Sequence, residues 1–442
     1  MLTTLFLDLN SYFASVEQQV QPHLRGKPVG VAPITGDSGC IIAASYEAKK
    51  FGVKTGTRVG EAKVLCPGVE IVDARPRLYV LMHHRILKAI DRHIPVERVH
   101  SIDEVSCRLD RRQRTPEAAR ELALRVKAEI AKSCGVCMRC SIGIAPNRLL
   151  AKLGTDLMKP DGLVILRNED LPAAIGHLSV QEFSGIGPRM TKRLKRAGVR
   201  TIAELYAKSE AEMRALWGGP FGERWYHVIR GAEVREKPTK KGSIGHQHVL
   251  APDLRTREGA KSVGLRLLLK ASARMRHDKY AAKKLSLGLR FEGDRPSTNA
   301  WNGPSWDEWA TLGGECVDSG TMQDALDALW ARAPEGKILM VAVTLHDLVP
   351  AASHTLPLFG GQNRSESLSK AMDAVNKKFG ANKVYPASMQ DARGHGTGGI
   401  AFNYVPNLEL ADSVQSRQRG GGEKRYMSDA EMEGLIEGSL RA

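Results

Sequence analysis

Three acidic side chains lie where the sequence predicts the ends of strands. Asp8 is near the end of residues 2–9, an almost unbroken apolar run that is typical of a buried strand. Asp103 and Glu104 lie between two short β-prone runs in VERVHSIDEVSCRL, which predict a hairpin. Buried carboxylates are costly unless they hold a cation, and oxygen ligands suit Mg²⁺. Two such ions ~3.5–4 Å apart can align a phosphoryl transfer. Acids of ordinary turns on a solvated surface are the alternative.

Composition limits the classes of protein that could carry such a site. The chain has 442 residues, of which 42% are hydrophobic, so it has enough apolar residues for more than one core. Its 65 Lys and Arg exceed its 49 Asp and Glu, and the net charge of +16 favours a polyphosphate partner. No apolar run is long enough to cross a membrane, and the N-terminus does not resemble a secretory signal. Seven cysteines without a regular spacing indicate a reducing, cytoplasmic environment.

The order of the expected elements predicts a multi-domain protein of α/β (α+β) class. Strands and helices alternate up to about residue 170, and a small helical unit follows at 171–234. A charged segment at 235–242 is expected to be a linker. Residues 243–350 then predict the order β-α-β-β-α-β, a split βαβ module. In the C-terminal extension, 351–442, an apolar helix is expected near 368–379, and the chain from Asp412 onward is expected to be mobile.

Three closely spaced cysteines raise the question of a zinc site. Cys134, Cys137 and Cys140 form CGVCMRC, but residues three apart on a strand point to opposite faces. A fourth ligand is also missing nearby, whereas structural zinc nearly always has four. We therefore expect buried structural cysteines here.

Five ordered motifs resemble the Y-family DNA polymerases, the translesion enzymes. They are DLNSYFASVEQ at 8–18, YEAKKFGV at 46–53, SIDEVS at 101–106, CSIGIAPNRLLAK at 140–152 and KPDG at 159–162, and the similarity spans about residues 1–345. The resemblance implies a right-handed polymerase with a palm (1–10 and 75–170) and short fingers (11–74). It also implies a helix-hairpin-helix thumb (171–234), the linker at 235–242 and a little finger (243–350).

The resemblance gives the acids a catalytic role. It implies that Asp8, Asp103 and Glu104, with the Leu9 carbonyl, bind two Mg²⁺ ions, for which Mn²⁺ is a possible substitute. The implied reaction is attack of a primer 3′-hydroxyl on the α-phosphate of a deoxynucleoside triphosphate, which releases pyrophosphate. Asn10 stands where the family frequently has Asp, although Asn also occurs there.

The resemblance also defines a nucleotide pocket. Amides of Ser11, Tyr12 and Phe13 lie at an expected helix N-terminus, which favours phosphate. Phe13 matches the steric gate that excludes a ribose 2′-hydroxyl, with an ordinary core aromatic as the alternative. Tyr46, Lys49 and Lys159 match positions that bind the triphosphate. Lys49 replaces the family's usual Arg and keeps the charge without the bidentate geometry. For Lys152 we expect an exposed position on a helix.

Two basic regions are expected to hold primer-template DNA. GIGPRMTKRL at 185–194 has the Gly-x-Gly turn and basic helix of a helix-hairpin-helix element, although such turns also serve as simple connections. Residues 235–290 contain 15 Lys or Arg against 4 Asp or Glu. The expected DNA contacts are Gly185, Gly187, Arg189, Lys192, Lys240, Lys241, Arg255, Lys283 and Lys284.

TLPLF at 355–359 resembles the peptide by which bacterial polymerases bind the sliding clamp, with Thr355 in place of Gln. Leu356, Leu358 and Phe359 would make the contact, and an apolar loop is the alternative. Residues 366–405 resemble C-terminal extensions of the UmuC-like bacterial branch.

The function predicted from these features is low-fidelity, template-directed DNA synthesis past damaged bases by a cytoplasmic, nucleoid-associated monomer. Its substrates are primed DNA and deoxynucleoside triphosphates. A catalytically silent DNA-binding paralogue and a metal-dependent nuclease are the alternatives.

Overall fold

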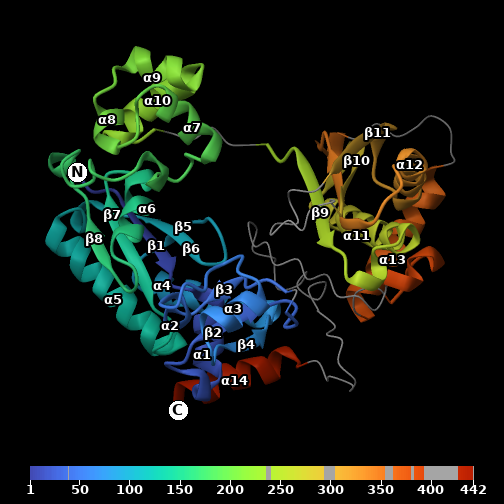
Figure 1. The fold of residues 1–442 in the computed structure, drawn as a ribbon, viewed down its shortest axis with the longest axis horizontal. Helices are drawn as coiled ribbons and strands as arrows, with labels where there is room; N and C mark the ends of the chain where they lie inside the picture. The colour runs from blue at the N-terminus through green and yellow to red at the C-terminus, as the bar shows by residue number, and fades with distance from the viewer. Residues whose placement is uncertain are drawn as a thin grey trace. The chain divides into compact units, whose positions relative to one another are not determined.

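The structure is a computed structural model that describes residues 1–37, 39–234, 240–292, 304–353, 362–379, 383–392 and 427–441. The chain divides into two compact units (Figure 1). The first contains residues 1–234 and a C-terminal helix, and the second contains the described residues from 240 to 392.

A five-stranded sheet, in the order β5-β6-β1-β7-β8, forms the centre of the first unit. The central strand β1 (Thr4–Leu9) is buried along its whole length, as its apolar sequence predicts. It pairs antiparallel with β6 (Glu104–Arg108) on one side and β7 (Cys140–Ala145) on the other. The remaining strands are β5 (Val96–Val99), which pairs antiparallel with β6, and β8 (Leu163–Ile165), which pairs parallel with β7.

Alternation along β1 assigns its side chains to two faces of the sheet. Phe6 belongs to the same apolar cluster as Leu150 and Leu153 of α6 (Arg148–Leu157). Asp8, two residues further along the strand, therefore lies on the face of the sheet that α6 covers. Leu5 and Leu7 point to the opposite face and are fully buried.

Two further groups of elements complete the first unit. A small sheet, in the order β3-β2-β4, contains β2 (Val29–Ala32), β3 (Ala43–Ala44) and β4 (Glu70–Asp73). The nearby helices are α1 (Tyr12–Val20), α2 (Tyr46–Lys49) and α3 (Val59–Leu65), whereas α4 (Pro76–Asp91) and α5 (Pro116–Cys134) pack on each other and against strands of the five-stranded sheet. The second group contains α7 (Pro188–Arg196), α8 (Ile202–Tyr206), α9 (Glu210–Trp217) and α10 (Pro220–Ile229), whose core is continuous with that around α6.

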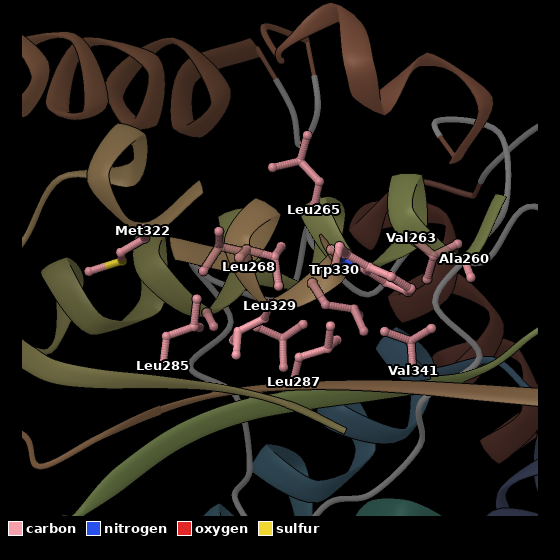
Figure 2. Packing of buried hydrophobic residues seen from close by; sticks show 14 of the residues in the cluster. Ala260, Val263, Leu265, Leu268, Leu285, Leu287, Met322, Leu329, Trp330 and Val341 are labelled. Atoms are coloured by element: carbon pink, nitrogen blue, oxygen red, sulfur yellow. The ribbon is translucent and has the colours of Figure 1, made fainter. Parts of the chain in front are cut away.

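The second unit is a four-stranded antiparallel sheet with two helices against one face. Its strand order is β11-β10-β12-β9, formed by β9 (Ser243–Val249), β10 (Tyr280–Phe291), β11 (Ser305–Cys316) and β12 (Ile338–His346). The helices are α11 (Arg257–His277) and α12 (Ser319–Arg332). Leu268, Leu287, Trp330 and Val341 meet in the core between the helices and the sheet (Figure 2). The expected order β-α-β-β-α-β is confirmed.

The C-terminal region differs in part from the expectation. The expected apolar helix is present as α13 (Gln362–Phe379). However, α14 (Asp429–Arg441) is a helix that packs on the first unit, so the expectation of a mobile chain from Asp412 onward is wrong for these residues. The TLPLF segment lies outside the described residues.

Two further observations concern cysteines and membrane spans. Strand β7 begins only at Cys140 and Cys137 lies in a turn, so the premise that Cys137 and Cys140 share a strand is wrong. All described cysteines are free. No helix in the described part of the chain is both long and apolar enough to cross a membrane.

Candidate active site

The pairing of β1 with β6 brings the acidic residues together. Asp8 lies directly opposite Glu104 in the register, and the Leu9 amide donates a hydrogen bond to the Asp103 carbonyl at 2.8 Å. Directly opposed residues of antiparallel strands present their side chains on the same face. Residues separated by almost a hundred positions therefore form one site, as the sequence predicts for the strand end and the hairpin.

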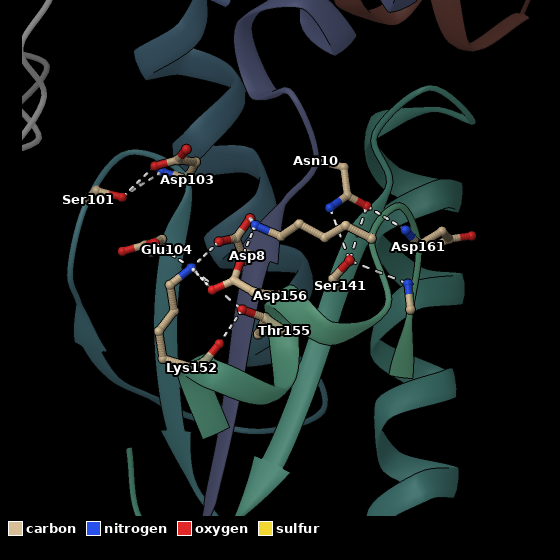
Figure 3. Close-up of polar contacts among 12 residues, drawn as sticks. Asp8, Asn10, Ser101, Asp103, Glu104, Ser141, Lys152, Thr155, Asp156 and Asp161 are labelled. Carbon is tan, nitrogen blue, oxygen red and sulfur yellow. Dashed lines mark hydrogen bonds and ion pairs between the residues drawn. The ribbon is translucent and has the colours of Figure 1, made fainter. Parts of the chain in front are cut away.

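The Asp103 carboxylate is turned away from the other two acids (Figure 3). It accepts a hydrogen bond from the Ser101 hydroxyl. Among the residues that the structure describes, no three His, Cys, Asp or Glu side chains are grouped closely enough to hold a metal ion. Asp103 and Asp8 still interact, since their mutual repulsion contributes to the raised pKa of Asp103 after the larger effect of burial.

Two lysines neutralise the carboxylates. The Lys152 ammonium lies between Asp8 and Glu104, forms an ion pair with Asp8 and is 2.9 Å from Glu104 Oε1 (Figure 3). The Lys159 ammonium is 2.8 Å from Asp8 Oδ1 and 2.8 Å from Asp156 Oδ1. Lys152 is also 3.4 Å from Asp156 Oδ2. The acids are thus held by cations that the chain itself supplies.

The pKa shifts follow from this arrangement. Burial raises the pKa of Glu104, Lys152 counteracts that rise, and the nearby Asp8 and Asp103 add to it. Burial alone would lower the pKa of Lys152, but the Asp8 and Glu104 carboxylates outweigh burial and raise it. Asp8, Asp103, Glu104 and Asp156 together carry more negative charge than Lys152 and Lys159 neutralise. This surplus on hard oxygen donors fits a divalent cation.

The start of α1 has the features of a phosphate site. Ser11 precedes the helix in a left-handed conformation (φ 48°, ψ 44°), which is uncommon outside glycine. Its hydroxyl oxygen is buried and has no hydrogen-bond partner. The amides of Tyr12 and Phe13 belong to the first turn, where helix amides lack intrahelical partners. A strained residue, an unpartnered hydroxyl and these amides together have the features of an anion cradle.

Phe13 is held in place by aromatic stacking. Its ring lies 4.5 Å from the ring of Tyr79 on α4, with an interplanar angle of 19°. The Tyr79 hydroxyl donates a 2.8 Å hydrogen bond to Glu17, which is fully buried and also binds Arg75. The Phe13 ring is itself only partly buried, unlike an ordinary core aromatic. The neighbouring Tyr12 side chain instead points inward, and its hydroxyl donates to the Tyr79 carbonyl at 2.6 Å.

The predicted triphosphate ligands lie close to one another. The Lys49 ammonium is 4.4 Å from the centre of the Tyr46 ring. Burial lowers the pKa of Lys49, and the neighbouring positive charge of Lys159 lowers it further. Two ammonium groups that repel each other in a half-buried position favour an anion between them. Tyr46, Lys49 and Lys159 are therefore brought together, as expected.

Asn10 fixes the loop that carries Lys159. The side-chain oxygen of Asn10 accepts a 2.7 Å hydrogen bond from the backbone amide of Asp161. The side-chain nitrogen of Asn10 donates to the Ser141 hydroxyl at 3.1 Å (Figure 3). Lys127 adds an ion pair with Asp161 at 2.7 Å. The residue that replaces the family's frequent Asp thus has a structural role in this site.

The predicted thumb contacts surround the start of α7. Gly185 has φ 102°, a conformation that a side chain would strain, and Gly187 caps the helix. Arg189 and Lys192 line a shallow basic hollow together with Arg193 and Arg196. These cations face solvent, where a phosphate backbone can approach them.

The predicted contacts in the second unit are mostly engaged in ion pairs. Lys241 pairs with Asp278, Lys283 lies 3.4 Å from Glu315, and Lys284 lies 2.9 Å from Asp347. Arg255 donates to the Leu250 carbonyl at 3.2 Å, and Lys240 is exposed. Acids therefore offset part of the basic excess of this segment.

Lys152 is the residue that sequence reasoning assigned incorrectly. Its side chain is 15% exposed and lies among the acids, so the expectation of an exposed helix lysine is wrong. The sequence contains one indication of this ion pairing, because Asp156 follows Lys152 by one helical turn on the same face of the helix. That indication becomes informative only when α6 is known to cover the face of β1 that holds Asp8.

Comparison with known proteins identifies the family of this chain. The impB/mucB/samB family model matches residues 7–156, and the model of that family's C-terminal domain matches residues 241–358. DNA polymerase IV of Moorella thermoacetica is 34% identical over 397 residues, which cover 87% of this chain and 95% of that protein. DNA polymerase IV of Pelotomaculum thermopropionicum is 33% identical over 396 residues, 87% of this chain and 94% of that protein.

Solved structures share the fold. A Y-family DNA polymerase chimera of Dbh and Dpo4 superposes with a TM-score of 0.64 at 24% identity, covering 79% of this chain and 99% of the chimera. The chain belongs to the impB/mucB/samB family, that is, to the Y family of DNA polymerases. The expected right-handed polymerase fold is confirmed. Polymerases of this family carry out translesion synthesis and depend on divalent metal ions.

Proposed function

We propose that this chain is a template-directed DNA polymerase that extends primers past damaged bases. A primer 3′-oxygen forms a bond with the α-phosphorus of a deoxynucleoside triphosphate, while the bond to the bridging oxygen breaks and pyrophosphate leaves. The observation that carries the proposal is the direct opposition of Asp8 and Glu104 on paired strands, with Asp103 adjacent. The anion cradle at the start of α1 lies at the end of the same strand β1.

The carboxylates are proposed to hold two Mg²⁺ ions, with Mn²⁺ as a substitute. Asp8, Asp103 and Glu104, with the Leu9 carbonyl, would supply the oxygens. When bound, the ions supply positive charge for both the attacking and the leaving oxygens. Binding requires Asp103 to turn from Ser101 and Lys152 to give up its place between Asp8 and Glu104.

The remaining residues bind and select the nucleotide. The Ser11 hydroxyl and the amides of Tyr12 and Phe13 would donate hydrogen bonds to the phosphate oxygens, and Tyr46, Lys49 and Lys159 would bind the other side of the triphosphate. The Phe13 ring, held by Tyr79, would clash with a 2′-hydroxyl. Selection by a clash does not require a contact to the correct sugar.

The domain roles follow the family. We assign the palm to residues 1–10 and 75–170, the fingers to 11–74, the thumb to 171–234 and the little finger to 243–350. Gly185, Gly187, Arg189 and Lys192 of the thumb are proposed to bind phosphates of the duplex without reading its sequence. Lys240, Lys241, Arg255, Lys283 and Lys284 are proposed to do so from the little finger. The clamp contact of Leu356, Leu358 and Phe359, the monomeric state and a place beside the bacterial chromosome remain proposals.

Primer extension tests the proposal against its two alternatives. Wild type is expected to extend a primed template with Mg²⁺ and to stop on addition of a chelator. Asp103→Ala should lower the rate by about 10³-fold or more, since metal-held charge contributes several kcal/mol to such a reaction. Asp37→Ala is the control, because Asp37 is an exposed acid that pairs with Lys63 and is not proposed to bind metal.

Each alternative predicts a different product. A silent DNA-binding paralogue would shift the mobility of primed DNA without extending it. A metal-dependent nuclease would shorten the substrate whether or not nucleotides are added. Either result would overturn the proposed polymerase function.

A further inference from the structure

The C-terminal helix α14 docks on three helices of the first unit, α1, α4 and α5. Met432 and Ile436, one helical turn apart, are buried, as is Ser439. The helix contacts α1, α4 and α5 (Figure 1). It has only 13 residues, so without this docking it would be marginal in water.

Charged side chains fix the helix at both ends. Near its start, Asp429 accepts hydrogen bonds from Nε and Nη2 of Arg77, one to each carboxylate oxygen, in a bidentate pair. Near its end, Glu437 accepts from Arg85 at 2.5 Å. Arg77 and Arg85 both belong to α4, eight residues apart, which sets the direction of α14 along α4. The Arg77 contact lowers the pKa of Asp429, as expected for a carboxylate held by a cation.

A buried glutamine connects α14 directly to α1. Gln19, in the last turn of α1, is 1% exposed. Its amide nitrogen donates to the Ser439 carbonyl at 3.1 Å and the Ser439 hydroxyl at 3.2 Å. Its side-chain carbonyl oxygen accepts a hydrogen bond from the backbone amide of Cys137 at 3.1 Å. Gln19 therefore joins three elements, and each of its hydrogen bonds would leave a buried polar group if broken.

The Gln19 side chain has little room to move. A Cβ on Gly135, the residue that ends α5, would lie 2.1 Å from the Gln19 side chain. Gly135 also has φ 105°, so glycine is required there on both counts. Arg25 adds a further contact between α1 and α14. Its Nη2 donates to the backbone carbonyl of Gln19 at 3.1 Å and to the backbone carbonyl of Ser439 at 2.9 Å.

Helix α1 carries the residues that these contacts affect. Phe13 lies in its first turn, Glu17 in its middle and Gln19 in its last turn. A nine-residue helix moves as a rigid rod about 14 Å long. A change at Gln19 therefore reaches the amides and the ring that are proposed to bind the nucleotide.

We propose that α14 is a positioning element for the nucleotide pocket. It binds the α1–α4–α5 surface and holds α1 in register with the acids. Occupancy of this surface by residues 428–441 sets the affinity for the incoming nucleotide. The kinetic part of this inference rests on the proposed polymerase function, whereas the docking itself does not.

Charge exchange in the full-length chain tests the inference. Arg77→Asp should release α14, and the double variant Arg77→Asp with Asp429→Arg should restore the contact with reversed polarity. Arg92→Asp is the matched control, since Arg92 pairs with Glu129 between α4 and α5 without touching α14. Ile436→Asp provides a second, independent way to release the helix.

Hydrogen exchange and steady-state kinetics are the two measurements. Arg77→Asp and Ile436→Asp should raise the exchange rate of α14 amides to that of an unstructured peptide and that of α1 amides about tenfold. They should also raise the KM for deoxynucleotides several-fold with little change in kcat. The double variant should restore the wild-type exchange rates and KM, and Arg92→Asp should change neither the exchange rates nor KM.

Three results would overturn the inference. One is unprotected α14 amides in the wild type, which would mean that the helix does not dock. A second is released α14 with unchanged α1 exchange and KM, and a third is no recovery in the double variant. If the chain extends no primer, the exchange data still decide whether α14 holds α1, so failure of the polymerase proposal is distinguishable.

Discussion

At the scale of single residues, the ammonium of Lys152 occupies the space between two carboxylates that are proposed to hold metal ions. A divalent cation and this ammonium compete for Asp8 and Glu104. The lysine keeps Asp8 and Glu104 together. At the proposed metal site it would also weaken metal binding, because part of the metal's binding energy would be used to displace it.

Lys152→Met separates these two effects. Without metal, the variant is expected to lose about 1–3 kcal/mol of stability, since truncating one partner of a buried pair costs about 3–5 kcal/mol and Lys159 still contacts Asp8. With Mn²⁺, its melting temperature should rise more than that of the wild type. Thermal unfolding in chelator and in Mn²⁺ measures both. Lys63→Met, at an exposed pair, is the control, and equal metal-induced shifts in Lys152→Met and wild type would refute the competition.

Phe13→Ala is the second prediction at this scale. Removal of the ring opens the space that a 2′-hydroxyl would need, so discrimination against ribonucleotides should fall by about 10²-fold or more. The ratio of kcat/KM for a deoxynucleotide and its ribonucleotide measures the change. Phe221→Ala, in an exposed position on α10, should leave the ratio unchanged. An unchanged ratio in Phe13→Ala would assign the ring to packing on Tyr79 alone.

At the scale of elements, helix α11 carries a row of cations one turn apart on one side. Burial, followed by the positive charges of Arg266 and Arg274, lowers the pKa of Lys270 to about 8. On the neighbouring strand β9, burial and the charges of Lys270 and Arg274 lower the pKa of His246 to about 3. The folded second unit therefore holds the Lys270 proton less tightly than the unfolded chain does.

The sign of the resulting pH dependence follows by linkage. The Lys270 side chain titrates near 8 when folded and near ~10.4 when unfolded. Between these values the unfolded chain binds more protons, so stability should rise as the pH increases from 8 to about 10. Lys270→Met should remove this rise and stabilise the protein by about 1–3 kcal/mol at pH 7. Calorimetric unfolding at pH 7 and pH 9.5 measures it, with exposed Lys261→Met as the control. A rise that persists in Lys270→Met would exclude this lysine as its source.

The elements themselves were largely predictable from the sequence. Residues 2–9 are predicted as a buried strand by their almost unbroken apolar run, and Thr115 followed by Pro116 is a pattern typical of a helix start, here that of α5. These signals are local. The docking of α14 was not predictable, because it depends on Arg77 and Gln19, more than three hundred residues earlier.

At the scale of the whole molecule, the Lys and Arg side chains that give the net charge of +16 are not equally available to bind DNA. The sequence placed 15 Lys or Arg in residues 235–290, but the structure pairs Lys241, Lys283 and Lys284 with acids. Sequence counts cannot reveal this, since Asp347 and Glu315 lie outside the counted segment. The cations of α7 instead line an exposed hollow.

This difference predicts how DNA binding depends on salt. Each phosphate neutralised by a cation contributes about 0.9 to the slope of log K against log salt. Arg189→Gln with Lys192→Gln should therefore lower the slope by about 2 and weaken all sequences alike. Lys284→Gln should lower it by less than 0.9, because binding must first separate Lys284 from Asp347.

Fluorescence anisotropy of primed DNA between 50 and 300 mM salt, about the range over which such binding weakens strongly, measures these slopes. Lys132→Gln, an exposed lysine in the last turn of α5, is the control for a change in net charge alone. If the control lowers the slope as much as one thumb substitution, the long-range field of the whole molecule governs binding. If only the substitutions of Arg189 and Lys192 lower the slope, local phosphate contacts at the hairpin govern DNA binding. The exposed hollow beside α7 leads us to expect this second result.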